Sequence, residues 1–258
     1  MTHGDITRGH LVRTERVDNA VAVIALNKPP LNLIDIPLLD ALLAALRAAR
    51  DDDTVRAIVI TTDLDRAFSA GLDLVQVLDG GSAVMRAMLQ RLYIDLFDIQ
   101  HTLGKPSIAA INGLARGGGL SMAVSCNVIV AASDASFGYP ELNVGILPGL
   151  HFTHLPRVAG RHKAFDLLFA GEPFDAAEAH HLGLVTRLAE PGDALASALA
   201  MARTFAQKPP EAMRHAREHF MRINDHGYRN EIASVVDTMA AMIDSAETRA
   251  ALERFLKR

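Results

Sequence analysis

Two stretches of small residues around glycine, residues 68–74 with Gly71 and residues 112–119 with four glycines, constrain this chain more than any other feature of its sequence. Each follows a short apolar run, at residues 55–61 and 107–111, whose β-branched residues predict a buried strand. Small residues let the backbone approach a ligand closely and leave N–H groups free to donate hydrogen bonds. Two such donors that converge on one oxygen atom would form an oxyanion hole.

Strands and helices are expected to alternate over the first two-thirds of the chain, and the last third is expected to be mainly helical. Turn residues Asp18 and Asn19 predict a hairpin between residues 11–16 and 21–26. The expected helices span residues 37–50, 82–103, 117–125, 162–170, 176–181, 193–206, 211–221, 231–244 and 247–257. The remaining expected strands span residues 127–132, 135–138 and 184–188. This alternation indicates an α/β fold.

Composition bounds the possible partners. The chain has 258 residues, half of them hydrophobic, which suits one domain with a smaller appendage or two domains. The net charge of −4 and the scattered basic residues argue against a nucleic-acid partner. A small anionic ligand would need only a local cluster of Lys and Arg.

Cysteine use and hydropathy bear on the compartment. Cys126 is the one cysteine, so no internal disulfide can form, and its apolar surroundings indicate a buried small side chain rather than a reactive thiol. Residues 1–12 are polar and lack the apolar core of a signal peptide. The longest fully apolar run, residues 21–26, is too short to cross a membrane. A cytoplasmic protein without a membrane partner is expected.

The glycine triplet at residues 117–119 does not fit a nucleotide-binding loop. A Walker loop would continue with Lys and Ser or Thr, whereas Leu120 follows here, and the spacing of a dinucleotide fingerprint is also missing. Tight packing of a helix on a strand is the alternative use for these glycines.

Taken together, the motifs resemble the enoyl-CoA hydratase/isomerase family, also called the crotonase family. The resemblance covers nearly the whole chain in the family's order. The matching segments are residues 26–29 with Asn32, 67–74, 105–106, 111–119, 137–149 and 160–185.

The resemblance implies a crotonase-like spiral of ββα units over residues 1–195. It also implies a C-terminal helical region, residues 196–258, that builds homotrimers, often paired into hexamers. The implied substrate is an acyl-CoA thioester of fatty acid metabolism. Coenzyme A is then part of the substrate, so no cofactor is expected, and no residues have the spacing of metal ligands. The helix over residues 85–103 is expected to line the acyl pocket.

By the same resemblance, the backbone N–H groups of Ala70 and Gly118 form the oxyanion hole. A thioester carbonyl gains negative charge when its α-carbon loses a proton, and each fixed donor is worth about 2.7–4 kcal/mol in such a site. Ser69, Gly71 and Gly117 adjoin these donors and are expected to border the substrate.

The acid/base residues distinguish between reactions. Hydratases of this family resemble one another in having two glutamates, but here only the later one, Glu141, is present, and Ser121 stands at the other position. A neutral hydroxyl is a poor acid or base, whereas one carboxylate suffices to move a proton from C2 to C4 of a 3-enoyl thioester. Enoyl-CoA isomerisation with Glu141 as base and then acid is therefore favoured.

Other reactions stay open. A hydratase of low activity is one alternative, and a decarboxylase or hydrolase that uses His151 or Tyr139 is another. A non-catalytic CoA-ester-binding or assembly subunit is the alternative outside enzymes.

The remaining polar candidates have structural alternatives. Asp73 suits the N-cap of the following helix better than catalysis. Tyr139 could hydrogen-bond a substrate or only pack, and His151 and His154 could approach the site. Lys28 and Arg66 flank segments that face coenzyme A in the family and are candidates to bind its phosphates, with solvated surface charge as the alternative.

Overall fold

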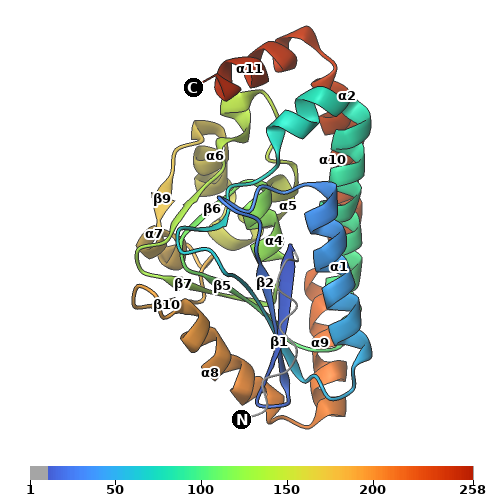
Figure 1. Cartoon of the computed structure of the whole chain (residues 1–258), viewed down its shortest axis with the longest axis vertical. Helices are drawn as coiled ribbons and strands as arrows, with labels where there is room; N and C mark the ends of the chain where they lie inside the picture. Colours follow the sequence, from blue (N-terminus) through green and yellow to red (C-terminus); the bar gives the residue numbers. More distant parts are fainter. Residues whose placement is uncertain (1–10, 258) are drawn as a thin grey trace.

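The computed structural model describes residues 11–257, so the expectation about a signal peptide, which concerns residues 1–12, lies almost wholly outside it. Two β-sheets lie at the centre of the molecule, with helices around them (Figure 1). The larger sheet has the order β1 (Val12–Val17), β2 (Val21–Leu26), β3 (Ala57–Thr62), β5 (Ser107–Ile111), β7 (Val128–Ala132) and β10 (Arg187–Ala189). The smaller sheet has the order β4 (Ala67–Ser69), β6 (Leu114–Arg116), β8 (Ser136–Gly138) and β9 (Phe174–Asp175).

From β3 to β8, consecutive strands alternate between the two sheets. β3, β5 and β7 lie in the larger sheet, and each is followed along the chain by a strand of the smaller sheet, β4, β6 or β8. Pairing is parallel within both sets, and helical segments connect one pair of strands to the next. Three successive ββα turns of this kind confirm the predicted α/β spiral.

The hairpin at the start of the described chain is also confirmed. β1 and β2 pair antiparallel, and Val17 lies opposite Val21. Asp18 and Asn19 have φ values of 50° and 57°. Three residues, 18–20, connect the strands, and asparagine and aspartate tolerate the left-handed conformation found at the first two.

The helical segments account for most of the rest of the chain. Those of the first two-thirds are α1 (Ile36–Asp51), α2 (Leu74–Leu89), η1 (Gln90–Asp95), α3 (Leu96–His101), α4 (Gly118–Val124), η2 (Pro140–Val144), α5 (Gly149–Ala159) and α6 (Arg161–Ala170). The later ones are α7 (Ala176–His181), α8 (Ala194–Ala206), α9 (Pro210–Asn224), α10 (Tyr228–Ile243) and α11 (Ala246–Leu256). Within residues 11–257, none of the helices has both the length and the apolar character needed to cross a bilayer.

Helices cover the larger sheet on both faces. α8 lies on the opposite side of the strands from α1 and α10 (Figure 1), and its Ala198, Met201 and Ala202 pack on a separate cluster that includes Val59 and Ile108. The expected boundary after residue 195 therefore falls within a helix that is packed on the sheet. α10 packs on α2 and α5 of the same chain.

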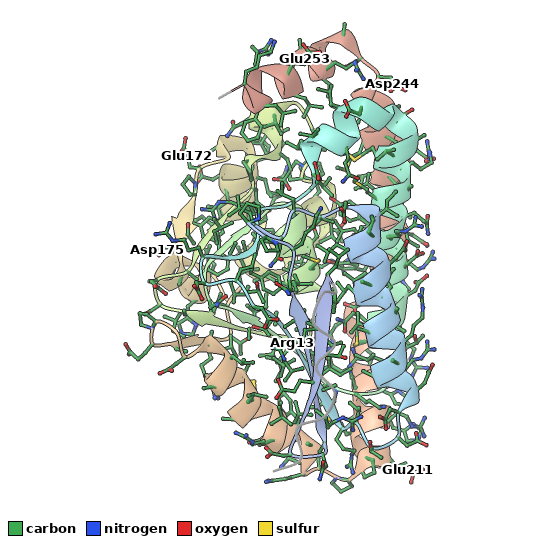
Figure 2. The ribbon with its side chains drawn as sticks, viewed as in Figure 1. Arg13, Glu172, Asp175, Glu211, Asp244 and Glu253 are labelled. Atoms are coloured by element: carbon green, nitrogen blue, oxygen red, sulfur yellow. The ribbon has the colours of Figure 1, made fainter. Side chains whose placement is uncertain are left out.

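The helix expected over residues 82–103 is longer and less regular than expected. It begins at Leu74, where the Asp73 side chain caps it, and Gly81 interrupts it with a φ of 62°. Asp244, at the end of α10, lies beside this interruption (Figure 2) and accepts a hydrogen bond of 3.0 Å from the Ser82 N–H. After α2 the chain continues through the π-helical turn η1 into α3.

Three other expectations need correction or completion. The late strand lies at Arg187–Ala189 rather than over residues 184–188. α5 was not expected at all, and it contains Pro156. The glycine-rich stretches themselves contain the short strands β4 and β6.

Cys126 is partly buried, and burial raises the pKa of its thiol to about 12, in keeping with an inert side chain.

Several helices expose large apolar side chains, among them α6 and α9. Phe220 and Ile223 of α9 are 66% and 71% exposed, and Phe165 and Phe169 of α6 stack on the surface with ring centroids 3.9 Å apart. Exposed apolar patches often mark contacts with other proteins. The homotrimer or hexamer that the resemblance implies stays a prediction.

The segment between β5 and β6 lies so close to the segment between β3 and β4 that one added methyl group at Gly113 should strongly lower the stability of the fold. A Cβ on Gly113 would lie 2.4 Å from the backbone carbonyl of Arg66, whereas a Cβ on Gly192 would meet nothing within 4 Å. We expect Gly113→Ala to lower the free energy of unfolding by about 3 kcal/mol or more. Gly192→Ala should cost about 1–2 kcal/mol, because only its left-handed φ is strained. Urea unfolding measures both, and equal losses would contradict this account.

Candidate active site

A cavity of about 260 Å³ lies where the two glycine-rich stretches meet. Its lining includes Ala70, Gly71 and Leu72 from the first stretch and Gly117 and Gly118 from the second. Apolar side chains complete much of the wall, among them Leu92, Val144, Ile146, Leu147 and Met239. α11 adds Phe255 and Leu256. As expected, the helical segment that carries Leu92 lines this pocket.

The first stretch does not leave the N–H of Ala70 free. That N–H donates to the carbonyl of Leu31 over 2.9 Å. Ser69 is fully buried, and its hydroxyl donates to the Asn32 carbonyl at 2.8 Å and accepts from the Gly71 N–H at 3.2 Å. The donor that sequence reasoning assigned to the substrate is thus used within the fold. In the described part of the chain, the Leu72 N–H has no acceptor.

The second stretch presents the N–H of Gly118. Gly118 is the first residue of α4, where the N–H groups of a helix have no partner within the helix. Gly71, with a φ of 96°, lies directly against this segment. A Cβ added to Gly71 would be 3.1 Å from the Arg116 carbonyl oxygen and 3.6 Å from the Gly118 nitrogen. Only glycine allows the two backbones to come this close.

Glu141 places a carboxyl group beside the second stretch. It belongs to η2 and is 7% exposed. A Cβ on Gly117 would lie 2.7 Å from its Oε1, so the absence of a side chain at Gly117 makes room for the carboxyl group. Burial raises the pKa of Glu141 to about 8, and its Oε2 has no hydrogen-bond partner among the described residues. An acid with a pKa near neutrality can both accept and donate a proton at physiological pH.

A buried polar cluster of Tyr93, Ser121, His151 and Tyr139 extends from the cavity wall into the interior. Tyr93 lines the cavity, and both burial and the charge of Glu141 raise the pKa of its phenol. The other three are expected substrate contacts, but they do not line the cavity and are at most 1% exposed. Sequence reasoning did not single out Tyr93, although its place in the helix expected to line the acyl pocket was the available signal.

His151 is held by hydrogen bonds and packing. Its Nε2 lies 3.2 Å from both the Ser121 hydroxyl and the Gly117 carbonyl oxygen. The Tyr139 ring packs on it with centroids 4.6 Å apart. Burial lowers the pKa of His151 to about 3, so the ring is neutral at physiological pH. His154 instead pairs with the Tyr228 hydroxyl at 3.2 Å, away from the cavity.

The expected charged contacts separate into two groups. Asp73 caps α2 by accepting from the Gln76 N–H, which confirms its structural role, and it also lines the cavity. Lys28 lies next to it, with its Nζ 3.7 Å from Asp73 and 2.5 Å from Asp35. Arg66 is exposed at the start of β4 and does not reach the cavity, because that strand runs from it toward Ala70.

On this spiral of ββα turns, two main-chain donors without acceptors among residues 11–257 and one buried carboxyl group line an apolar cavity. Such an arrangement can stabilise negative charge on a carbonyl oxygen. A model of the family described as enoyl-CoA hydratase/isomerase matches residues 16–258, and the chain belongs to this family.

Relatives and solved structures agree with this membership. The chain is 33% identical over 244 residues to a probable enoyl-CoA hydratase of Bacillus subtilis, with 94% of each chain covered. It is 37% identical over 211 residues to a probable enoyl-CoA hydratase of Mycobacterium tuberculosis, with 78% of this chain and 77% of the relative covered. The crystal structure of an enoyl-CoA hydratase from Bacillus halodurans matches with a TM-score of 0.87 and 25% identity, over 95% of this chain and 99% of that one.

The raised pKa of Glu141 predicts how pH affects stability. The folded chain holds a proton that the unfolded chain releases above a pH of about 4.5, so stability falls as the pH rises from there toward about 8. Glu141→Gln removes this dependence. We expect the variant to be about 3 kcal/mol more stable than the parent at pH 7, since each pKa unit is worth about 1.4 kcal/mol, and equally stable near pH 4. Denaturant unfolding at both pH values measures this, and an equal difference at both would refute it.

Proposed function

We propose that this chain isomerises a 3-enoyl-CoA to the corresponding 2-enoyl-CoA. The observation that carries the proposal is the buried carboxyl group of Glu141 in the cavity, whose Oε2 has no partner among the described residues, together with two cavity-lining residues, Leu72 and Gly118, whose N–H groups lack acceptors there. The other carboxylate in the cavity wall, Asp73, is engaged by Lys28 and by the N-terminus of α2. One group that both takes and returns a proton is sufficient for a double-bond shift.

In the proposed reaction, the thioester oxygen accepts hydrogen bonds from the N–H groups of Leu72 and Gly118. The Glu141 carboxylate removes a proton from C2, and the electrons of the breaking C–H bond move into a dienolate whose charge lies on the thioester oxygen. Protonated Glu141 then returns the proton to C4, which leaves the double bond between C2 and C3. Atoms and charge balance without any further reactant. A pKa near 8 suits both steps.

The choice of Leu72 over Ala70 follows from the hydrogen bonds of the first stretch. A donor already bonded to the Leu31 carbonyl would have to break that bond before it could bind an oxyanion. Leu72 directly follows Gly71, and a Cβ on Gly71 would lie 3.6 Å from the Gly118 nitrogen, so the two donors belong to adjoining segments. Two donors already in place need no reorganisation during the reaction.

Hydration of a 2-enoyl-CoA is the second candidate, because the Bacillus and Mycobacterium relatives are named as hydratases. Water addition needs one group to activate the water and a proton for the α-carbon. The hydroxyl of Ser121 lies behind the cavity wall and is 1% exposed. His151 and Tyr139 are also buried and do not line the cavity. Their burial argues against hydrolysis or decarboxylation that depends on either of them.

Turnover of matched substrates tests the proposal. We expect 3-enoyl-CoA isomerisation to exceed hydration of the 2-enoyl-CoA of the same chain length, and Glu141→Gln to lower the isomerisation kcat about 10²–10⁴-fold. In the parent enzyme, kcat/KM should rise about tenfold per pH unit and level off near pH 8, because only the carboxylate of free Glu141 is active as a base.

Three results would count against this assignment. Faster hydration would favour the second candidate, turnover of neither substrate would favour a CoA-ester-binding subunit, and full activity of Glu141→Gln would exclude Glu141 as the base.

Replacement of single backbone amides by esters tests the donors. An α-hydroxy acid with the leucine side chain at position 72 removes only the N–H group. We expect kcat to fall about 10²–10³-fold, as for the loss of one oxyanion donor. The matched control is the alanine analogue at position 70, which breaks the bond to the Leu31 carbonyl. It should lower the melting temperature and leave kcat nearly unchanged, whereas the reverse pattern would assign the donor to Ala70.

A further inference from the structure

We infer that His151 is a positioning residue for the oxyanion hole, through its hydrogen bond to the peptide group that joins Gly117 and Gly118. This inference rests on the proposed function. Three donors lie around the Gly117 carbonyl oxygen. They are the Ser121 N–H at 3.0 Å, the His151 Nε2 at 3.2 Å and the Ser121 hydroxyl at 3.4 Å.

The geometry of the peptide bond links this carbonyl to the catalytic donor. The C=O of Gly117 and the N–H of Gly118 belong to one planar group, so fixing the direction of the first fixes the direction of the second. Gly117 has a φ of 45° and carries no side chain to hold it in place. Donors to an oxyanion act only within about 10–20° of the productive direction. A hydrogen bond that fixes the Gly117 carbonyl therefore also fixes the direction of the Gly118 N–H.

The same hydrogen bonds also act through polarisation. A carbonyl that accepts hydrogen bonds makes the N–H of its own peptide group a stronger donor, by about 10–30% for each bond in a chain. The cluster is fully buried, which limits competition from water. His151 therefore both orients and strengthens the Gly118 N–H.

The surroundings of His151 fit a neutral donor. With the proton on Nε2, the ring donates toward the Gly117 carbonyl, and Nδ1 is left as an acceptor without a partner among the described residues. Tyr139 covers the ring, and the Ser121 hydroxyl, the nearest polar side chain to Nε2, carries no charge. The burial that lowers the pKa of His151 keeps this donor unchanged over the working pH range.

A nucleophilic Ser–His pair does not explain these contacts. A nucleophile must reach the substrate, but Ser121 does not line the cavity. A histidine base is also oriented by an acceptor at its other nitrogen, whereas Nδ1 of His151 has none in residues 11–257.

Two substitutions separate the hydrogen bond from the volume of the ring. Glutamine can place an amide N–H near the position of the His151 Nε2, whereas methionine fills similar space without a donor. We expect His151→Met to lower kcat about 10–100-fold with KM within about twofold, and His151→Gln to recover most of the loss. His154→Gln is the matched control, because His154 is on the same helix and partly buried but bonded to Tyr228.

Vibrational spectroscopy of a bound acyl-CoA provides a readout that a purely structural role would not change. With a ¹³C-labelled thioester carbonyl, we expect the shift of the C=O stretch to lower frequency on binding to be smaller in His151→Met than in the parent, and restored in His151→Gln. The same shift in all variants, or equal losses in the methionine and glutamine variants, would overturn the inference. If the parent shifts the carbonyl but does not isomerise 3-enoyl-CoA, the proposed reaction fails while the spectra still test His151.

Discussion

Close contact between the two glycine-rich backbones is the constraint on which the rest of the site depends. β4 and β6 pair in parallel, so the segments that follow them leave the smaller sheet side by side. Gly71 then packs against the Arg116 carbonyl, and a Cβ on Gly119 would lie 2.4 Å from the Ser69 carbonyl oxygen. Side chains at these positions would separate the backbones. The close approach of these two backbones is therefore a consequence of sheet pairing and of the absence of Cβ atoms.

The same apolar enclosure that assists the proposed chemistry destabilises the fold. Water exclusion strengthens hydrogen bonds to a developing oxyanion, but it also disfavours the charged form of Glu141. The carboxyl group thereby gains a pKa suited to proton transfer at the expense of stability at neutral pH. Tyr93 experiences the same environment, because both burial and the charge of Glu141 raise the pKa of its phenol.

Much of the fold follows from local sequence patterns, whereas the details of the site depend on tertiary contacts. β-Branched runs identified β3 and β5, and leucine spacing identified α1. α5 escaped notice because Pro156 disfavours a helix locally, although the surrounding packing holds one. The free donor could not be chosen from sequence, since it depends on the bond from Ala70 to Leu31, which lies far along the chain. Likewise, no pattern indicates that His151 reaches the Gly117 carbonyl.

Position 121 links the choice of reaction to the construction of the site. A glutamate there would place a second carboxyl group near the oxyanion peptide and suit water addition. Serine instead lies behind the cavity wall, where its hydroxyl and the Gly117 carbonyl oxygen are both 3.2 Å from the His151 Nε2. An enzyme with one acid gains nothing from a second charge close to Glu141, which would repel it, but it still needs a rigid oxyanion hole. The exchange of a carboxylate for a neutral Ser–His pair is thus consistent with a proton shuttle that uses Glu141 alone.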